Sequence, residues 1–203
     1  MYKLLCCSFL LVLMAGTNSF SQEFEIGPMF NLEHTSFNIP DDSFIVIGGP
    51  GTGGNGSRTT GFENNFGGGI YGSYFFSEQL ALSAELFYTK TSSTEFGDKS
   101  FSSINLIPYL SYKFFEEVPL FLNLGGGIAY MLKTPDFGDA YSIEENEIKK
   151  IDIPLKFSVS YNVKDFFLID LGIHSSVTRV VEDKILRTAY FLGVKVPLNK
   201  LLN

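Results

Sequence analysis

His174, Ser176 and Glu182 are the residues of this sequence whose types and spacing come nearest to a catalytic set. Residues two positions apart share one face of an extended strand, so the imidazole and the first hydroxyl would point the same way. A hydroxyl beside a base and an acid is the arrangement of a hydrolase that works through an acyl-enzyme. The alternative is a polar histidine with ordinary partners, which we prefer because the residues flanking His174 carry no hydrolase motif.

Two glycine-rich stretches could bind phosphate groups. Gly67, Gly69 and Gly72 match the spacing of the dinucleotide fingerprint, but that motif opens a helix, whereas these glycines lie within one predicted strand and lead to another. Residues 48–57 lack the lysine of a P-loop. We therefore predict no cofactor, and we expect the strand glycines to let a curved sheet bend and pack bulky neighbours.

The remaining candidate for ligand chemistry is an acidic segment at residues 136–147. Its carboxylates could collect calcium or meet cation-bridged lipopolysaccharide, but they lack the ordered spacing of a dedicated calcium loop. No cluster of cysteine or histidine offers a transition-metal site. We predict a solvated surface loop here and no metal site.

Charge and targeting signals limit the compartment and the partners. The chain has 22 acidic and 15 basic residues, and the absence of basic clusters argues against nucleic acid as a partner. Lys3, an apolar run over residues 4–14 and the small residues Ser19 and Ser21 predict a signal peptide at residues 1–21. The run is too short for a transmembrane helix. Both cysteines, Cys6 and Cys7, lie in this segment, so residues 22–203 form an exported domain without disulfides.

The element that would position His174 and Ser176 is a pair of strands between Ile151 and Thr178. Apolar residues occupy every second position from Ile151 to Val163 and again from Phe167, and polar residues fill the places between them. This period of two predicts an antiparallel hairpin with one apolar and one polar face. The apolar face would be covered either by a second sheet, as in a soluble sandwich, or by lipid, as in a membrane barrel.

The rest of the chain repeats this alternation. Eight strands are predicted, at about residues 24–33, 62–76, 80–89, 103–114, 120–132, 151–163, 167–178 and 187–196. The connections between them are alternately long and short, which is typical of a barrel with its long loops on one side and its tight turns on the other. We predict an all-β fold, an eight-stranded antiparallel up-and-down transmembrane β-barrel, with an exported sandwich as the alternative.

If the apolar rows face lipid, the polar rows face the interior of the barrel. The interior set includes both signs of charge, and it comprises Glu63, Glu85, Lys113, Asp152, Lys156, Asp170, His174, Arg187 and Lys195. Charges withdrawn from water must pair or stay hydrated, so we predict an interior polar network. Because eight strands leave an interior that side chains can fill, the barrel should be plugged.

The sequence also resembles a family. The segments at residues 67–72, 82–90, 106–114 and 124–130, the first reading GGGIYG and the last LGGGIAY, look like those of the PorT-type outer-membrane β-barrel proteins of Bacteroidetes. The resemblance implies an OmpA-like eight-stranded barrel in the cell outer membrane, and the named member takes part in type IX secretion. Such proteins often end on an aromatic residue that closes the last strand, whereas here residues 197–203 follow it.

Together these patterns predict a small non-enzymatic outer-membrane barrel that acts in envelope structure, surface binding or type IX secretion-related assembly. The expected partners are outer-membrane lipid and lipopolysaccharide, with secretion or envelope proteins in addition, and no nucleic acid. The alternative function is a lipid-modifying hydrolase, similar to lipid A deacylases, that would use His174 and Ser176.

Overall fold

The computed structural model describes residues 23–39, 58–93, 99–134, 148–164, 166–180 and 186–201. The predicted signal peptide at residues 1–21, the glycine-rich segment at residues 48–57, the acidic segment at residues 136–147 and Glu182 lie outside the described residues.

The described chain is almost entirely β-strand. In chain order the elements are β1 (Glu23–Ile39), β2 (Arg58–Phe75), β3 (Leu80–Ser93), β4 (Lys99–Lys113), β5 (Leu120–Gly126), β6 (Ile128–Lys133), β7 (Ile151–Asp152), β8 (Pro154–Val163), β9 (Phe167–Ser176), β10 (Leu186–Lys195) and the short helix α2 (Leu198–Leu201). β5 and β6 are parts of one strand interrupted at Gly127, and β7 and β8 of one interrupted at Ile153. The ten segments are therefore eight strands.

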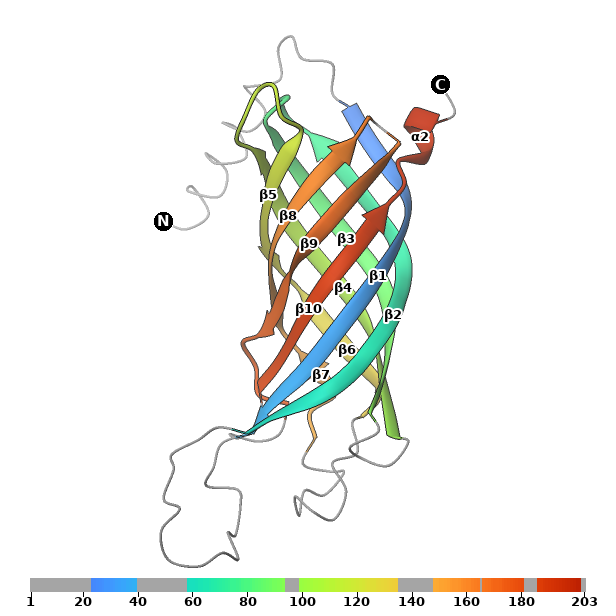
Figure 1. The fold of residues 1–203 in the computed structure, drawn as a ribbon, viewed down its shortest axis with the longest axis vertical. Helices are drawn as coiled ribbons and strands as arrows, with labels where there is room; N and C mark the ends of the chain where they lie inside the picture. Colours follow the sequence, from blue (N-terminus) through green and yellow to red (C-terminus); the bar gives the residue numbers. More distant parts are fainter. Residues whose placement is uncertain are drawn as a thin grey trace, which may run out of the picture.

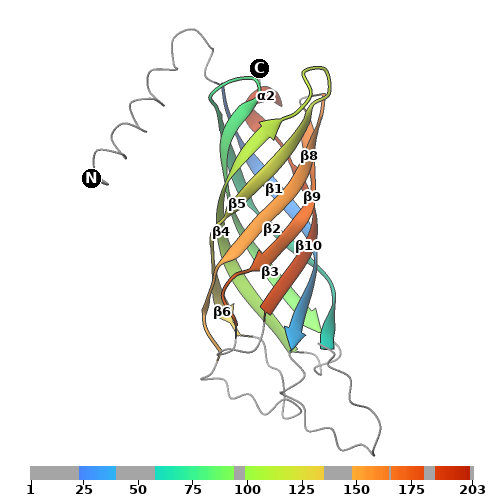
Figure 2. The same cartoon turned by 90° about the vertical axis from the view of Figure 1, so that its left-hand side faces the viewer.

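These strands close into a barrel. Each pairs with its sequence neighbour in antiparallel fashion, and β10 pairs with β1 to complete the ring. Figures 1 and 2 show the resulting cylinder of tilted strands. The predicted eight-stranded antiparallel barrel is confirmed, and no helix among the described residues is long and apolar enough to cross a membrane.

The two ends of the barrel differ. The tight turns that follow β2, β4 and β8 lie at one end together with α2, which we call the turn end. The chain leaves β1, β3, β6 and β9 at the opposite end, the loop end. The connections after β1, β6 and β9 are longer than the turns, as predicted, whereas the one after β3, residues 94–98, is no longer than the turn after β4, residues 114–119.

Strands β1 to β4 are longer at the loop end than the sequence pattern predicted. β1 continues from residue 33 to Ile39, and β2 begins at Arg58 in a region predicted as loop. The two strands pair in this region from His34 with Asn64 to Ile39 with Arg58, with a register shift between His34 and Ser36. The alternation of apolar and polar residues fades there because hydrogen bonding between the strands, rather than burial of an apolar face, maintains the pairing.

The outward face of the barrel is apolar. Large apolar side chains with more than a third of their surface exposed line it on every strand, among them Phe30, Ile70, Leu86, Leu106, Leu124, Phe157, Leu171 and Leu192. The described outward-facing strand side chains with basic groups are His34, Lys90 and Lys133, and all three lie toward the loop end. A water-exposed surface of this kind would be a large aggregation-prone patch, whereas lipid covers it at no cost.

Aromatic residues flank the outward apolar belt at both ends. Near the turns they include Tyr74, Phe76, Tyr112, Phe114, Tyr161, Phe166 and Phe167, and toward the loop end Tyr88, Tyr130 and Tyr190. Amphipathic rings at both boundaries of an apolar band are typical of barrels that cross a bilayer. The fold is that of a transmembrane β-barrel.

The interior is less polar than the sequence alternation suggested. Met29, Tyr71, Phe87 and Ile107 form a buried cluster with Leu168 packed against it. Toward the loop end, the rings of Phe37 and Phe101 meet edge to face with centroids 5.5 Å apart. Apolar and charged side chains therefore share the interior, because eight strands enclose a lumen that side chains can fill.

Gly69 shows why glycine is needed on β2. An added Cβ at this inward-facing position would lie 2.1 Å from the carbonyl oxygen of Leu86 and 2.5 Å from Cα of Phe87. At the neighbouring Gly68, which faces outward, the nearest atoms would be 3.8 Å away.

We therefore expect Gly69→Ala to lower the free energy of unfolding by about 1–3 kcal/mol, as overpacking does, and Gly68→Ala to change it by less than about 0.5 kcal/mol. Urea unfolding of the barrel refolded into detergent micelles or vesicles measures both. Equal stability of the two variants would show that close packing of β2 on β3 does not require Gly69.

Candidate functional site

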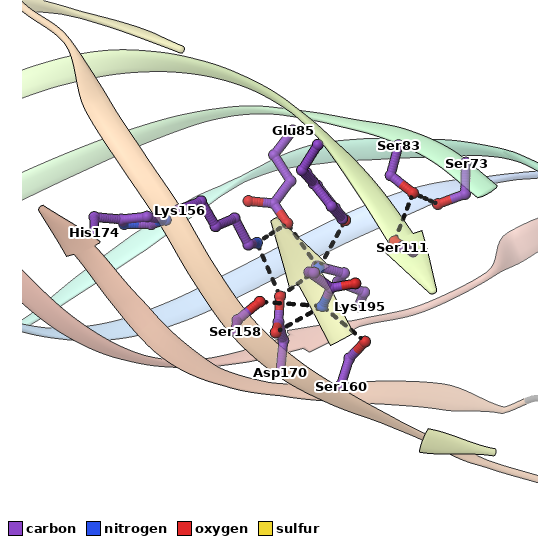
Figure 3. A network of polar contacts seen from close by, with 12 residues as sticks. Ser73, Ser83, Glu85, Ser111, Lys156, Ser158, Ser160, Asp170, His174 and Lys195 are labelled. Carbon is purple, nitrogen blue, oxygen red and sulfur yellow. Dashed lines mark hydrogen bonds and ion pairs between the residues drawn. The ribbon is translucent and has the colours of Figure 1, made fainter. Parts of the chain in front are cut away.

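Four charged side chains meet in the middle of the barrel: Glu85 from β3, Lys156 from β8, Asp170 from β9 and Lys195 from β10, which we call the central charge cluster (Figure 3). Lys156 Nζ lies 2.5 Å from Glu85 Oε1 and 2.9 Å from Asp170 Oδ2. Lys195 Nζ lies 2.7 Å and 2.6 Å from the same two oxygens. Each cation thus bridges both acids.

The cluster crosses the whole lumen. In the ring of eight strands, β3 and β9 lie on opposite sides, yet Glu85 and Asp170 share the same two lysine partners. All four side chains are at most 2% exposed. The strand alternation brings them together because every second residue on each strand points inward.

Neutral groups complete the surroundings of the cluster. Lys195 Nζ donates a hydrogen bond of 3.0 Å to the Tyr109 hydroxyl, and Lys156 Nζ lies 4.4 Å from the centre of the Tyr109 ring. Asn123 donates to Ser158 and Ser160 at 3.0 Å each and to Asp170 Oδ1 at 3.4 Å. Two positive and two negative charges with hydrogen-bonded neighbours meet the condition under which buried ions are tolerated.

A second ionic group lies nearer the loop end. Arg187 Nη2 is 2.9 Å from Asp152 Oδ2, and the hydroxyls of Ser176 and Thr178 donate to the same carboxylate at 2.7 Å and 2.9 Å. Asp152 therefore has a charged partner and two neutral ones. This group links β7, β9 and β10 rather than crossing the lumen.

The His174 ring is packed between aromatic side chains. Its ring is stacked against Phe191 with centroids 4.4 Å apart and against Phe87 with centroids 6.0 Å apart. His174 Nδ1 lies 3.7 Å from Glu33 Oε1, whereas Ser176 is bonded to Asp152. No hydrogen bond of the described residues joins the histidine to the serine. Both side chains are buried inside the barrel, on the opposite side of the wall from lipid.

The predicted interior residues thus have different positions. Glu85, Lys156, Asp170 and Lys195 form one cluster, Asp152 and Arg187 another, and His174 lies between aromatic rings. The assignment of Lys113 to the network is wrong: it is at the turn end, where its Nζ donates a hydrogen bond of 2.8 Å to the carbonyl oxygen of Glu116. Its position as the last residue of β4 explains this. Glu63 falls on β2, but its side chain lies outside the described part of the structure.

The sequence analysis missed two buried acids, Glu25 and Glu33. They are 1% and 4% exposed on the inward face of β1. The same period of two predicts that they point inward, because residues 25 and 33 lie an even number of positions from inward-facing Asn31 on β1. Two neutral residues that contact the central charge cluster, Tyr109 and Asn123, could not be predicted from the pattern of charged residues.

A small cavity lies between the central charge cluster and the turn end. Its polar lining includes Tyr71, Ser83, Ser111, Asn123 and Lys195, and its volume is about 20 Å³. Serines of β2, β3 and β4 are linked across one wall, with 2.8 Å between the hydroxyls of Ser73 and Ser83. Room of this size suits about one ordered water molecule, not an organic ligand. Among the described residues, no group of three or more potential ligands could hold a metal ion.

The last described segment packs against the turn end. Lys200 Nζ is 2.6 Å from Glu25 Oε1 and 3.1 Å from Glu23 Oε1. Partial burial opposes the charged form, but the hydrogen bonds and negative charges of Glu25 and Glu23 outweigh it and raise the pKa of Lys200 above its ordinary value. The ammonium is therefore charged at neutral pH.

The closed ring, the outward apolar belt and the filled interior define a small membrane-spanning β-barrel of eight strands. Its fold is similar to that of Neisserial surface protein A (NspA), with a TM-score of 0.52 and 16% identity over 86% of this chain and 99% of that chain. Ail, the attachment invasion locus protein of Yersinia pestis, has a TM-score of 0.46 and 15% identity, covering 85% of this chain and 97% of that chain.

The N-terminal β-barrel domain of Pseudomonas aeruginosa OprF has a TM-score of 0.40 and 12% identity, covering 82% of this chain and 96% of that chain. At 16% identity, the similarity to NspA shows the fold and nothing finer. Comparison with protein-family models found no match, and neither did comparison with curated protein sequences. The resemblance to PorT-type proteins therefore stays a prediction.

Proposed function

We propose that this protein is a non-enzymatic barrel of the cell outer membrane that anchors and presents its loop-end segments rather than conducting solutes. Membrane barrels need closed rings because every backbone group must be paired in lipid, and closed antiparallel barrels with long loops on one side are the outer-membrane type. On this proposal the loop end faces the cell exterior and the turn end faces the periplasm.

The observation that carries the proposal is the central charge cluster. Its ion pairs run from β3 to β8, β9 and β10 and so cross the full width of the lumen. The buried side chains of Met29, Tyr71, Phe87 and Ile107 pack beside these ion pairs, since Tyr71 and Ile107 are the cross-strand neighbours of Glu85. A hydrated solute would have to separate these ion pairs and displace the packed side chains in order to pass.

We expect vesicles that contain the refolded protein to show no swelling in an arabinose gradient beyond that of protein-free vesicles. A general porin at the same protein-to-lipid ratio is the positive control. Swelling at a rate that rises with the amount of protein would contradict the plugged barrel and with it this proposal.

The finer role follows from what a plugged barrel can do. Its exterior segments can bind a surface partner or lipopolysaccharide, and the resemblance to PorT-type proteins supports a part in type IX secretion-related assembly with secretion or envelope proteins. Deleting the gene and scoring secretion and surface adhesion separately distinguishes these roles. Loss of neither would leave envelope structure as the remaining role.

The structure offers no support for the alternative hydrolase. Lipid substrates contact the outside of a barrel, whereas His174 and Ser176 point into its interior. The only acid within reach of Ser176 in the described structure is Asp152, which also bonds Arg187 and Thr178, and His174 is stacked between two phenylalanines. Acyl transfer needs the hydroxyl and the base to be hydrogen-bonded.

A further inference from the structure

The first strand extends past the last one at the turn end. Pairing of β1 with β10 runs from Asn38 with Leu186 down to Met29 with Lys195. Pairing of β1 with β2 continues further, to Glu23 with Phe75. Residues 23–28 therefore have a strand on one side, and among the described elements no strand lies on the other.

The segment that follows β10 occupies this open edge. Asn199 Oδ1 accepts a hydrogen bond of 3.2 Å from the Ile26 amide, and Asn199 Nδ2 donates to the Phe24 carbonyl oxygen. The Val196 amide donates to the Pro28 carbonyl oxygen at 3.0 Å. Residues 24, 26 and 28 alternate along the edge, which is the spacing at which a neighbouring strand would bond to β1. The side-chain amide thus replaces part of a strand.

The helix of this segment is short and exposed. α2 has four residues, none of them buried, and Leu198 and Leu201 remain 45% and 43% exposed. A helix of this length has no stability of its own in water. Its contacts with β1 include the bonding of Asn199, the hydrogen bond from the Val196 amide to Pro28, and the ion pairs of Lys200 to Glu25 and Glu23, and Pro197 before the helix is buried. The pair with Glu23, whose side chain is 51% exposed, contributes little, whereas the pair with Glu25, whose side chain is 1% exposed, contributes more.

We propose that residues 23–28 of β1 are an interaction surface for an extended basic peptide segment of a partner protein, which displaces α2 and adds to the barrel wall as a strand. The backbone of such a segment would supply the hydrogen bonds that Asn199 now makes, as in other cases of strand addition. A lysine or arginine of the segment would take the place of Lys200 beside Glu23 and Glu25. The inference goes beyond the proposed function and does not depend on which side of the membrane the turn end faces.

The test uses the full chain refolded into lipid nanodiscs and a fluorescein-labelled probe peptide, acetyl-Thr-Val-Lys-Val-Thr-Val-amide. We expect it to bind, and to bind about tenfold more tightly to the double variant Asn199→Ala/Lys200→Ala, in which α2 no longer competes, since tenfold corresponds to about 1.4 kcal/mol. A peptide with glutamate in place of lysine should bind more weakly. A peptide N-methylated at alternate residues should not bind, because it lacks the amide donors.

Amide hydrogen exchange locates the binding. In the double variant the Ile26 amide should exchange faster than in the wild type, and the probe peptide should slow it again. Failure of the peptide to bind, equal binding of the N-methylated peptide, or an Ile26 amide that stays unprotected when the peptide is bound would each overturn the proposal. So would dimerisation of the double variant without peptide, since the edge would then serve a second copy of this chain. Unchanged heat-modifiable migration of the variant shows that its barrel is folded.

Discussion

Lys156→Met is expected to lower the free energy of unfolding of the barrel by about 3–5 kcal/mol, the cost of removing one partner from a buried ion pair. Methionine keeps most of the length and apolar character of the lysine stem, so the variant removes a charge rather than volume. Glu85 and Asp170, at most 1% exposed, would then have to share Lys195 as their only cationic partner among the described contacts of the central charge cluster. Urea unfolding of the barrel refolded into vesicles measures the loss.

Two further variants separate charge pairing from side-chain packing. Lys156→Met/Glu85→Gln removes one charge of each sign and should recover most of the lost stability, because Asp170 and Lys195 remain as a balanced pair. Lys113→Met removes a lysine that contacts only a turn carbonyl in the described structure, and it should change the free energy by less than about 0.5 kcal/mol. A Lys156→Met protein as stable as the wild type would show that ion pairing in the central charge cluster does not stabilise the barrel.

Leu171→Arg is expected to cost about 2–4 kcal/mol of folding free energy in vesicles, because it places a charge near the middle of the bilayer. Leu171 lies at the centre of β9 and is 64% exposed on the outward face. In water such an exposed position would accept arginine freely. Ser175→Arg on the same outward row, near the loop end of β9, is the matched control and should cost only about 0–1 kcal/mol. An equal loss of folding free energy in the two variants would contradict a bilayer around the barrel, because the cost of a charge should then depend on its depth.

Much of the fold could be predicted from the sequence because a barrel wall imposes one simple pattern. Every second residue faces lipid, so the period of two from Ile151 to Val163 fixed both the strand and its outward face. The alternating lengths of the connections then fixed the topology. The loop-end extensions of β1 and β2 could not be predicted in this way, since outside the membrane the pattern no longer needs to be apolar.

The interior could be predicted only in part. Inward alternation selected Glu85, Lys156, Asp170 and Lys195, but not which of them would meet, because strand tilt and stagger decide which residues share a level of the lumen. Lys113 has the same parity and is excluded only by its place at the end of β4. The contact of α2 with β1 depends on a side-chain amide bonding to a strand edge, which no sequence period marks.

Spin labels on the outward face of these strands report whether hydrocarbon covers that face. With Cys6 and Cys7 replaced by serine, single cysteines at Ile169, Leu171 and Ile173 would be labelled and the protein refolded into vesicles. We expect frequent collisions of the labels with dissolved oxygen and exclusion of a water-soluble nickel reagent, both strongest at residue 171. Nickel collisions equal to those of a loop-end label at residue 177, or labels shielded from both reagents by a second layer of protein, would contradict it.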